Sequence, residues 1–188
     1  MKVSDNRLRA DNQQERLVKS GWIVGFVDGE GCFSLGFVKQ PGNKHRKGYK
    51  TGYQIFHEFA VTQGEKSLPA LYELQRFFSV GKVFANKRYD NHKEHLYRYV
   101  VRKREDLLKV IIPFFQTHNL QTSKANDFKK FAQCMRIIEA GNHVTHEGLL
   151  EIALIVETMN RKKSKQDLIR ILRDYKSDPK PVLELGKI

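Results

Sequence analysis

The sequence has little cysteine, no long apolar run and no recognisable targeting segment. Its two cysteines, Cys32 and Cys134, lie far apart, so we expect neither a disulfide framework nor a CxxC metal site. No apolar stretch approaches the roughly 20 residues needed to span a bilayer. The N-terminal stretch MKVSDNRLRADNQQERLVKS contains acidic groups and no apolar centre, unlike a secretory signal or a transit peptide. We therefore expect an intracellular protein in a reducing compartment, with no membrane partner.

Positive charge, by contrast, is abundant. Among 188 residues, 34 are Lys or Arg and 21 are Asp or Glu, which gives a formal net charge of +13. A hydrophobic fraction of 40% is enough for a folded core in one domain or two very small ones. The positive excess favours a polyanionic partner, with nucleic acid ahead of a membrane surface. Charge alone does not separate an enzyme from a passive binder.

Hydrophobic spacing predicts an α+β fold in the order α-ββ-α-ββ-α, followed by further helices. Pro113 is expected to kink or end the helix that contains it. We expect a polar leader over 1–14, a main domain over 15–160, and a basic helix and tail over 161–188. The expected helices cover 15–30, 65–79, 104–115, 122–140, 145–160 and 165–175, and the expected strands cover 32–40, 53–63, 82–89 and 96–103.

A row of glycines lies in the first expected helix. Gly21, Gly25 and Gly29 recur every four residues, so on a helix they form one ridge without side chains. Because each glycine inside a helix costs about 0.5–1 kcal/mol relative to alanine, the ridge needs a reason, and close approach of another backbone supplies one. The sequence has one such ridge, so a second copy across a two-fold axis is its natural partner.

Two carboxylates, Asp28 and Glu30, flank Gly29 where this helix is expected to end, and its glycines suit a helix C-terminus. Two copies would bring at least two carboxylates together. Such oxygen ligands suit Mg²⁺, or Mn²⁺, and phosphodiester chemistry. For an isolated DGEG segment, a pair of solvated side chains in a glycine-rich turn is the alternative.

The window GWIVGFVDGEGCFSL resembles the LAGLIDADG motif of the homing endonucleases. The passage YQIFHEFAVTQGEKSLPALYELQRFFSVGKV is similar to the region that follows the motif in single-motif members, and NLQTSKANDFKKF resembles their later helix start. The resemblance covers roughly residues 16–140. It implies the αββαββα LAGLIDADG fold, with a curved antiparallel four-stranded sheet and, in this chain, additional C-terminal helices.

The resemblance also implies a function. Single-motif members are homodimeric, intron-encoded enzymes that make double-strand breaks in long pseudo-palindromic DNA targets by metal-dependent hydrolysis. One alternative is an RNA maturase that binds its host intron RNA, and another is a DNA-binding protein on the same scaffold that does not cleave. The compartment, a chloroplast, a mitochondrion or a prokaryotic cytoplasm, stays open.

Catalytic and metal-binding roles are implied by the same resemblance. Glu30 matches the motif carboxylate that binds the divalent metal, and the Gly29 carbonyl would be a backbone ligand. Asp28 matches the acidic position that supports the helix end. Gln63 aligns with a polar residue that orients water, although a plain glutamine at a strand end is an equally good interpretation.

A lysine completes the family site. Lys124 is the nearest match, but another alignment places Gln121 there, and Lys124 or Lys66 would then have to reach the site. The glycines Gly21, Gly25 and Gly29 would form the dimer interface.

The sheet is expected to read DNA in the major groove, with alternate residues facing the duplex. Most lysines among the candidates named below are expected to be solvated or to contact phosphates, and Lys39, Lys103 and residues 161–165 are expected to contact phosphates. Arg98 belongs to the set if the strand has the opposite parity. The DNA-binding candidates are Ser34, Gly36, Val38, Gln40, Lys44, His45, Arg46, Lys47, Lys50, Gln54, Lys66, Lys82, Asn86, Arg88, His95, Tyr97, Arg98 and Arg102.

Overall fold

The computed structural model describes residues 3–40, 51–86, 95–159 and 166–174. Its four strands form one antiparallel sheet in the order β1-β2-β4-β3. The α+β prediction and its element order are therefore confirmed. The strands are β1 (Gly31–Lys39), β2 (Tyr53–Gly64), β3 (Lys82–Asn86) and β4 (Leu96–Val101).

The helices follow the predicted order closely. The first begins at Val3, well before the apolar spacing starts, so the expected polar leader is helical from that residue. Within the described residues, no helix is both long and apolar enough to cross a membrane. The helices are α1 (Val3–Glu30), η1 (Glu65–Ser67), α2 (Leu68–Phe78), α3 (Arg104–Asp106), η2 (Leu107–Ile111), α4 (Ile112–Thr117), α5 (Lys124–Glu139), η3 (Asn142–Val144), α6 (His146–Glu157) and α7 (Gln166–Asp174).

The chain divides into two compact units. Unit 1 comprises Met1–Leu35 and Phe56–Ala132, and unit 2 comprises Gly36–Ile55 and Gln133–Ile188. Strands β1 and β2 and helix α5 therefore each contribute residues to both units. Each unit consists of two separate chain segments.

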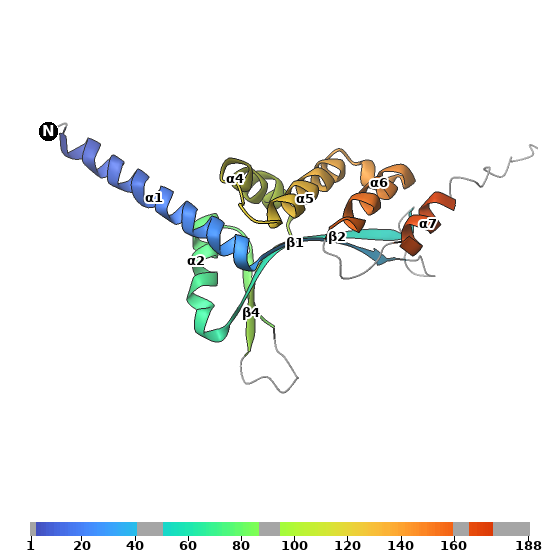
Figure 1. Ribbon diagram of the computed structural model, residues 1–188, viewed down its shortest axis with the longest axis horizontal. Coiled ribbons are helices and arrows are strands. Elements are labelled where there is room, and N and C mark those ends of the chain that lie inside the picture. Colours follow the sequence, from blue (N-terminus) through green and yellow to red (C-terminus); the bar gives the residue numbers. More distant parts are fainter. Residues whose placement is uncertain (1–2, 41–50, 87–94, 160–165, 175–188) are drawn as a thin grey trace, which may run out of the picture. The chain divides into compact units, whose positions relative to one another are not determined.

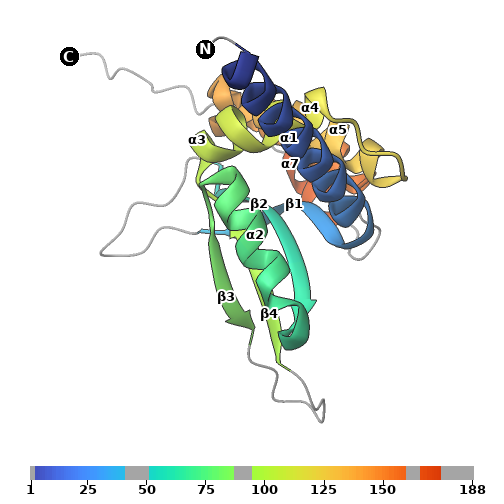
Figure 2. The same cartoon turned by 90° about the vertical axis from the view of Figure 1, so that its left-hand side faces the viewer.

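Unit 1 has an aromatic core on one side of its sheet. Phe33 of β1 packs against Phe59, Phe115, Phe128 and Phe131, with ring centroids 5.0–5.6 Å apart. Helix α2 lies along β3 and β4 in the same unit (Figure 2). Figure 1 shows the N-terminal part of α1 extending beyond α2 and α4. On β2 and β4, Phe59, Val61, Tyr99 and Val101 share the side of this core, and Glu58 and Arg98 lie on the other side of the sheet.

Unit 2 has its own small aliphatic core, made by α6 and α7. Leu149, Ala153, Leu168, Ile169 and Leu172 are its buried members. Three partly buried side chains from the β1–β2 hairpin pack against this cluster together with Leu150. They are Phe37, Tyr53 and Ile55.

Pro113 does not end its helix, although it was expected to kink or end it. The helical stretch from α3 continues through Pro113 to Thr117, and the turn before the proline widens into the π-helical segment η2. A proline ring clashes with the carbonyl group four residues earlier, here that of Lys109, and a π turn gives this ring more room. The helix therefore accommodates the proline by a local change of pitch.

Helix α1 passes directly into β1 at Gly31. No glycine of this junction has a left-handed φ, since the described glycines with positive φ are Gly52, Gly81 and Gly141. The expectation of a C-terminal glycine cap is therefore wrong in its mechanism. A Cβ atom at Gly31 would lie 2.5 Å from the Val27 side chain and 2.7 Å from its carbonyl oxygen. Glycine is required here by close approach.

Candidate functional site

The end of α1 is anchored to the start of α5 through Asp28. Its carboxylate accepts hydrogen bonds from the backbone N–H of Gln121 at 2.7 Å and of Thr122 at 3.1 Å, and from the Thr122 hydroxyl at 2.8 Å. Burial raises the pKa of Asp28, but these hydrogen bonds and the charge of Lys124 outweigh it, so the pKa lies below its usual value. The ionised form of Asp28 is thus favoured where its carboxylate joins the end of α1 to the segment before α5, and its supporting role in the site stays a prediction.

Lys124 lies at the first residue of α5 and donates a hydrogen bond from its ammonium group to the Gly31 carbonyl. This contact brings a cation to the residue that follows Glu30. The side chain of Gln121 instead donates to the Asn119 carbonyl at 2.9 Å. Both alternatives from the sequence lie near the helix end, and Lys124 is the one that supplies charge.

Glu30 is the last residue of α1, and its side chain is exposed. The carbonyl of Gly29 belongs to the last helical turn, where carbonyl groups lack partners within the helix. Exposed carboxylate and carbonyl oxygens are the donors that Mg²⁺ accepts, and this ion keeps several waters and needs one or two carboxylates. Within the described residues, no three His, Cys, Asp or Glu side chains form a metal cluster. The donor set fits a divalent ion when a second carboxylate is supplied.

Gln63 is the penultimate residue of β2 and pairs with Tyr97 of β4. Because β1 and β2 are antiparallel neighbours, the end of β2 and the start of β1 lie at the same end of the sheet. Gln63 therefore lies at the end of the sheet where α1 enters β1. Its role with water stays a prediction.

The glycine ridge faces outward. Gly21, Gly25 and Gly29 are exposed, and a Cβ atom built at any of them would meet nothing within 4 Å. Val18, which is 66% exposed, and Trp22, which is 38% exposed, lie on the same side of the helix. This open, partly apolar surface is what close packing against another helix requires.

The predicted DNA-binding residues of β3 and β4 fall on two faces. The register pairs Lys82 with Val100 and Asn86 with Leu96, which places both of these β3 residues on the side of Arg98. Tyr97 shares the side of the buried Tyr99, facing the core. The DNA-binding candidates of β3, Lys82 and Asn86, therefore share a face of the sheet with Arg98 and Arg102 and not with Tyr97.

On β1 and β2, the predicted residues fall in both units. In unit 1, the Ser34 hydroxyl lies 3.1 Å from the thiol of Cys32. In unit 2, the amide of Gln40 donates to that of Gln54 at 3.4 Å, and Val38 is exposed on the same strand as Gly36.

Several predicted contacts lie elsewhere. Lys66 is exposed in η1, Lys103 precedes α3, and His95 is exposed just before β4. Lys39 ends β1 in unit 2 and is exposed. Those outside the described residues are Lys44, His45, Arg46, Lys47, Lys50, Arg88 and the basic stretch 161–165.

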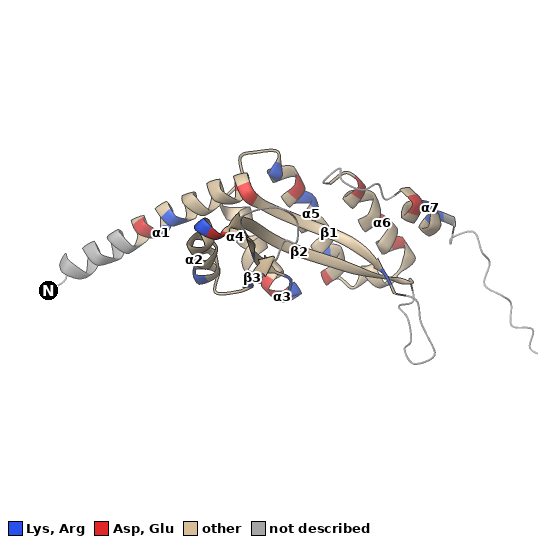
Figure 3. Ribbon diagram, turned by 90° about the horizontal axis from the view of Figure 1, so that it is seen from below, with Lys and Arg blue, Asp and Glu red and all other residues tan. Residues whose placement is uncertain are grey.

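A cluster that the sequence interpretation missed lies on the face of β2 and β4 opposite the aromatic core. Glu58 is buried and forms ion pairs with Arg98 at 2.5 Å and with Arg102 at 2.7 Å. Phe59 faces the core, so alternation along β2 places the adjacent Glu58 on the other face of the sheet. This alternation was the sequence signal that could have drawn attention to Glu58. Figure 3 shows that the ribbons of β1 and β2 carry few charged residues.

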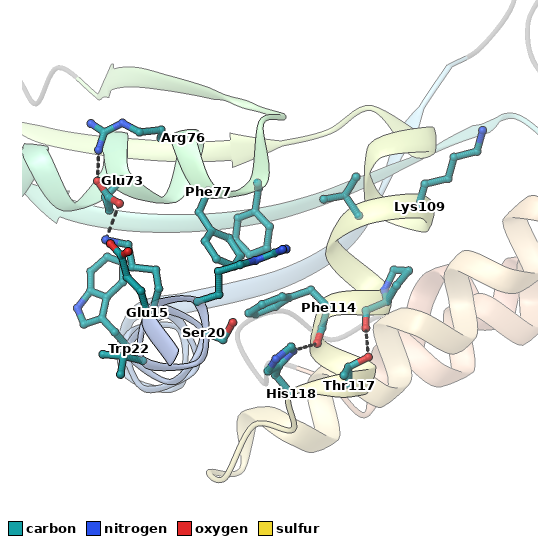
Figure 4. Close-up of a pocket in the computed structure, with 16 residues that line it drawn as sticks. Glu15, Ser20, Trp22, Glu73, Arg76, Phe77, Lys109, Phe114, Thr117 and His118 are labelled. Carbon is teal, nitrogen blue, oxygen red and sulfur yellow. Dashed lines mark hydrogen bonds and ion pairs between the residues drawn. The ribbon is translucent and has the colours of Figure 1, made fainter. Parts of the chain in front are cut away.

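A separate hollow of about 1080 Å³ lies between α1, α2 and α4 (Figure 4). Glu73 bonds Lys19 and Arg76 on one side of it, and the ring of His118 stacks on Phe114 on the other. Lys19 also lies 5.2 Å from the ring of Trp22. This hollow contains none of the predicted catalytic residues.

The sequence profile of a protein family described as LAGLIDADG endonuclease matches residues 23–135, more than half of the chain. The chain belongs to this family. The resemblance stated from the motif and the following strands is therefore confirmed.

Curated relatives carry endonuclease names. The chain is 30% identical over 131 residues to the probable intron-encoded endonuclease 2 of Neurospora crassa, and 33% identical over 141 residues to the probable intron-encoded endonuclease 3 of the same fungus. These alignments cover 70% and 74% of this chain. The chain spans about a quarter of the length of these relatives, 25% and 24%.

Solved LAGLIDADG structures share the fold. The homing endonuclease I-TnaI has a TM-score of 0.66 and 36% identity, over 83% of this chain and 96% of its own. The meganuclease I-SmaMI, bound to uncleaveable DNA, has a TM-score of 0.67 and 28% identity, over 77% of this chain and 45% of its own. Another I-SmaMI structure holds an uncleaved DNA target in the presence of calcium ions. The LAGLIDADG fold is thus confirmed for this chain.

Proposed function

We propose that the chain is a site-specific homing endonuclease that makes double-strand breaks in a long pseudo-palindromic DNA target as a homodimer with Mg²⁺, or Mn²⁺. The observation that carries this proposal is the exposed Glu30 at the end of α1, beside the open glycine ridge and the Lys124 ammonium. Relatives are named as probable intron-encoded endonucleases, which favours DNA cleavage over the RNA maturase alternative. The endonuclease domain would cover 15–160, between a leader over 1–14 and a basic tail over 161–188.

Two copies packed through their glycine ridges would each contribute one Glu30. Glu30 and the Gly29 carbonyl would hold the divalent ion, with the second carboxylate coming from the other copy. When bound, a divalent ion lowers the pKa of an attacking water and stabilises charge on the phosphate. Lys124, fixed on the Gly31 carbonyl, would balance negative charge as the phosphate is attacked. The Gln63 amide would accept a hydrogen bond from the water or donate one to it.

The full chain should be incubated with Mg²⁺ and a plasmid library of intron-free mitochondrial gene fragments. Mitochondrial genes are chosen because relatives are named for a Cox1 intron and for intron 1 of ND4, and we propose an organelle as the compartment on the same ground. We expect double-strand cuts at a single sequence. Glu30→Gln should abolish cutting while a gel shift shows that DNA binding is kept.

The matched control is Glu15→Gln, since Glu15 is another exposed glutamate of α1, far from its C-terminal end. It should cut as the unmodified chain does. Lys124→Met should slow cutting roughly a hundredfold, whereas Gln121→Ala should not. Undiminished cutting by Glu30→Gln, or no cutting of the library with either metal, contradicts the proposal.

A further inference from the structure

Glu58 is the one acidic residue within the four strands. It lies on the sheet face opposite the aromatic core, the face expected to meet a polyanion. Its side chain is only 5% exposed. A buried carboxylate is costly unless charged partners and hydrogen bonds compensate it, so its place on this face needs an explanation.

Two arginines from the neighbouring strand surround this carboxylate. Arg98 donates from Nη2 to one oxygen at 2.5 Å. Arg102 donates from Nε to the other oxygen at 2.7 Å, and its Nη2 lies 2.7 Å from the same oxygen. The arginine side chains remain 32% and 55% exposed. The carboxylate is therefore covered, whereas both arginine side chains remain partly exposed.

The strand register makes the contact with Arg98 unusual. Arg98 is paired with Thr62, and Val100 with Ala60. Glu58 therefore lies four residues along β2 from the position opposite Arg98, about 13 Å of strand. The Arg98 side chain has to run lengthwise over the sheet to reach Glu58, and Ala60, which lies between the two positions on β2, is only 2% exposed.

Arg102, in contrast, lies next to Glu58 across the strands, one residue beyond the pair formed by Phe59 and Val101. The guanidinium carbon of Arg102 also lies 5.4 Å from the centre of the Phe56 ring. An aromatic face and a carboxylate together fix the orientation of this guanidinium. The two guanidinium groups thus meet at one place, although their residues are four positions apart.

Each arginine retains donors for another acceptor. A guanidinium carries five N–H groups, and Arg98 uses Nη2 alone on Glu58. Arginine donors pair bidentately with the O6 and N7 atoms of guanine in the major groove. A held arginine gives this contact at a defined place, whereas an unheld one samples many rotamers.

We propose that Glu58 is a positioning residue for target specificity, which directs Arg98 and Arg102 to guanine at one base pair or at two adjacent base pairs of each half-site. This inference rests on the proposed function for its DNA target. It assigns Glu58 no direct contact with DNA. Its ion pairs bring the guanidinium group of Arg98 along the sheet toward that of Arg102.

The test is a binding selection from randomised DNA without divalent metal, with the full chain. Glu58→Gln keeps the size of the side chain and removes its charge. We expect the preference for guanine to fall roughly tenfold or more at one or two adjacent positions per half-site, with other positions unchanged. Arg98→Ala and Arg102→Ala should weaken the same positions. Glu73→Gln, which alters an ion-paired glutamate of α2, is the matched control and should leave the profile unchanged.

An unchanged profile in Glu58→Gln, or a uniform loss of affinity at all sequences, overturns the proposal, because the arginines would then contact phosphates. If Glu58→Gln does not fold, Arg98→Ala and Arg102→Ala decide. The proposal is supported if the two variants lose the preference for guanine at the same or adjacent base pairs. It is overturned if these base pairs lie several positions apart. Because the selection needs no cleavage, specific binding by a chain that cuts nothing would contradict the proposed function alone. A chain that selects no sequence at all overturns the specificity role of Glu58.

Discussion

The hydroxyl of Thr122 donates a 2.8 Å hydrogen bond to the carboxylate of Asp28 and accepts one of 3.3 Å from the Lys124 backbone N–H. Thr122 therefore links the first turn of α5 to the end of α1. The linked segments carry Lys124 and Glu30, so the separation of these groups depends on this connection. A carboxylate that accepts three hydrogen bonds is well suited to hold two helix ends together.

We expect Asp28→Asn to lower the free energy of unfolding by about 1–2 kcal/mol, because the amide introduces a donor where donors already converge. Urea denaturation measures this loss. Thr122→Val should cost less than Asp28→Asn, and the double variant should cost less than the sum of the two, since both remove the same bond. Strict additivity would contradict the coupling.

The contribution of Asp28 should depend on pH. Its pKa in the folded chain lies below the usual value of 3.8, so the folded state favours the ionised form. This stabilisation is complete above the usual pKa and is lost as the pH falls through the lower pKa of the folded chain. The difference in unfolding free energy between the unmodified chain and Asp28→Asn should therefore be constant near neutral pH and shrink below pH 3.8. A difference in unfolding free energy that grows as the pH falls would contradict a lowered pKa of Asp28 in the folded chain.

The glycine ridge predicts the behaviour of Gly25→Leu. Nothing in the described protomer lies within 4 Å of a Cβ at Gly25, so the protomer should keep its helical circular dichroism. A close helix contact across the ridge should be excluded sterically, and sedimentation should show monomers. The proposed dimer would bury Trp22, the single tryptophan, so its emission should lie at longer wavelength in Gly25→Leu than in the unmodified chain.

Gln13→Leu is the control for this experiment. It places the same side chain on the exposed surface of α1, about 120° around the helix from Gly25. It should leave the sedimentation of the unmodified chain unchanged. A dimer that persists unaltered in Gly25→Leu would refute the proposed interface.

Gly81 and Gly141 form a second matched pair. Both have left-handed φ values, of 79° and 78°. A Cβ at Gly81 would lie 2.7 Å from the Val100 carbonyl oxygen and 2.8 Å from the Tyr99 ring, whereas one at Gly141 would meet nothing within 4 Å. Gly141→Ala should cost about 1–2 kcal/mol for its backbone conformation, and Gly81→Ala clearly more, as measured by denaturation. Equal losses of unfolding free energy in the two variants would show that β4 moves away from the new methyl group without loss of stability.

The two thiols should differ in reactivity. Cys134 is buried, and burial, with the nearby charge of Glu151, raises the pKa of its thiol to about 12. Cys32 is exposed on β1. A thiol reagent should modify one cysteine per native chain and two per unfolded chain, and Cys32→Ser should remove the native reaction. Modification of Cys134 in the native chain would show that the packing around α5 opens.

The elements were readable from the sequence because most of them obey local rules. Apolar residues at helical spacing give α2 and α5 within a few residues of their observed bounds, and alternation gives all four strands. Pro113 does not end its helix, and a π turn precedes it. Such a change of pitch depends on packing around the helix, which no short window contains.

The site was readable only in part. Glu30 and Lys124 are named through motif resemblance, and their roles stay predictions, as does that of Asp28 in the last turn of α1. The ion pairs of Glu58 were missed because they depend on the register of β2 against β4, strands that are separated by a helix and another strand. The same register decides that Arg98 and not Tyr97 shares the face of Lys82. Pairing between distant strands is set by the whole core and not by either strand alone.

The interleaved construction of the two units limits how far the chain can be shortened. The family match ends at residue 135, yet Phe37, Tyr53 and Ile55 inside it pack against side chains that lie beyond it on α6 and α7. A chain stopped at that boundary would expose a patch of aromatic and aliphatic surface on its longest hairpin. During synthesis, the residues that pack against this patch are made more than 90 residues later, since Tyr53 precedes Leu149 by 96 positions. We therefore expect versions shortened at residue 135 to aggregate more readily than the full chain.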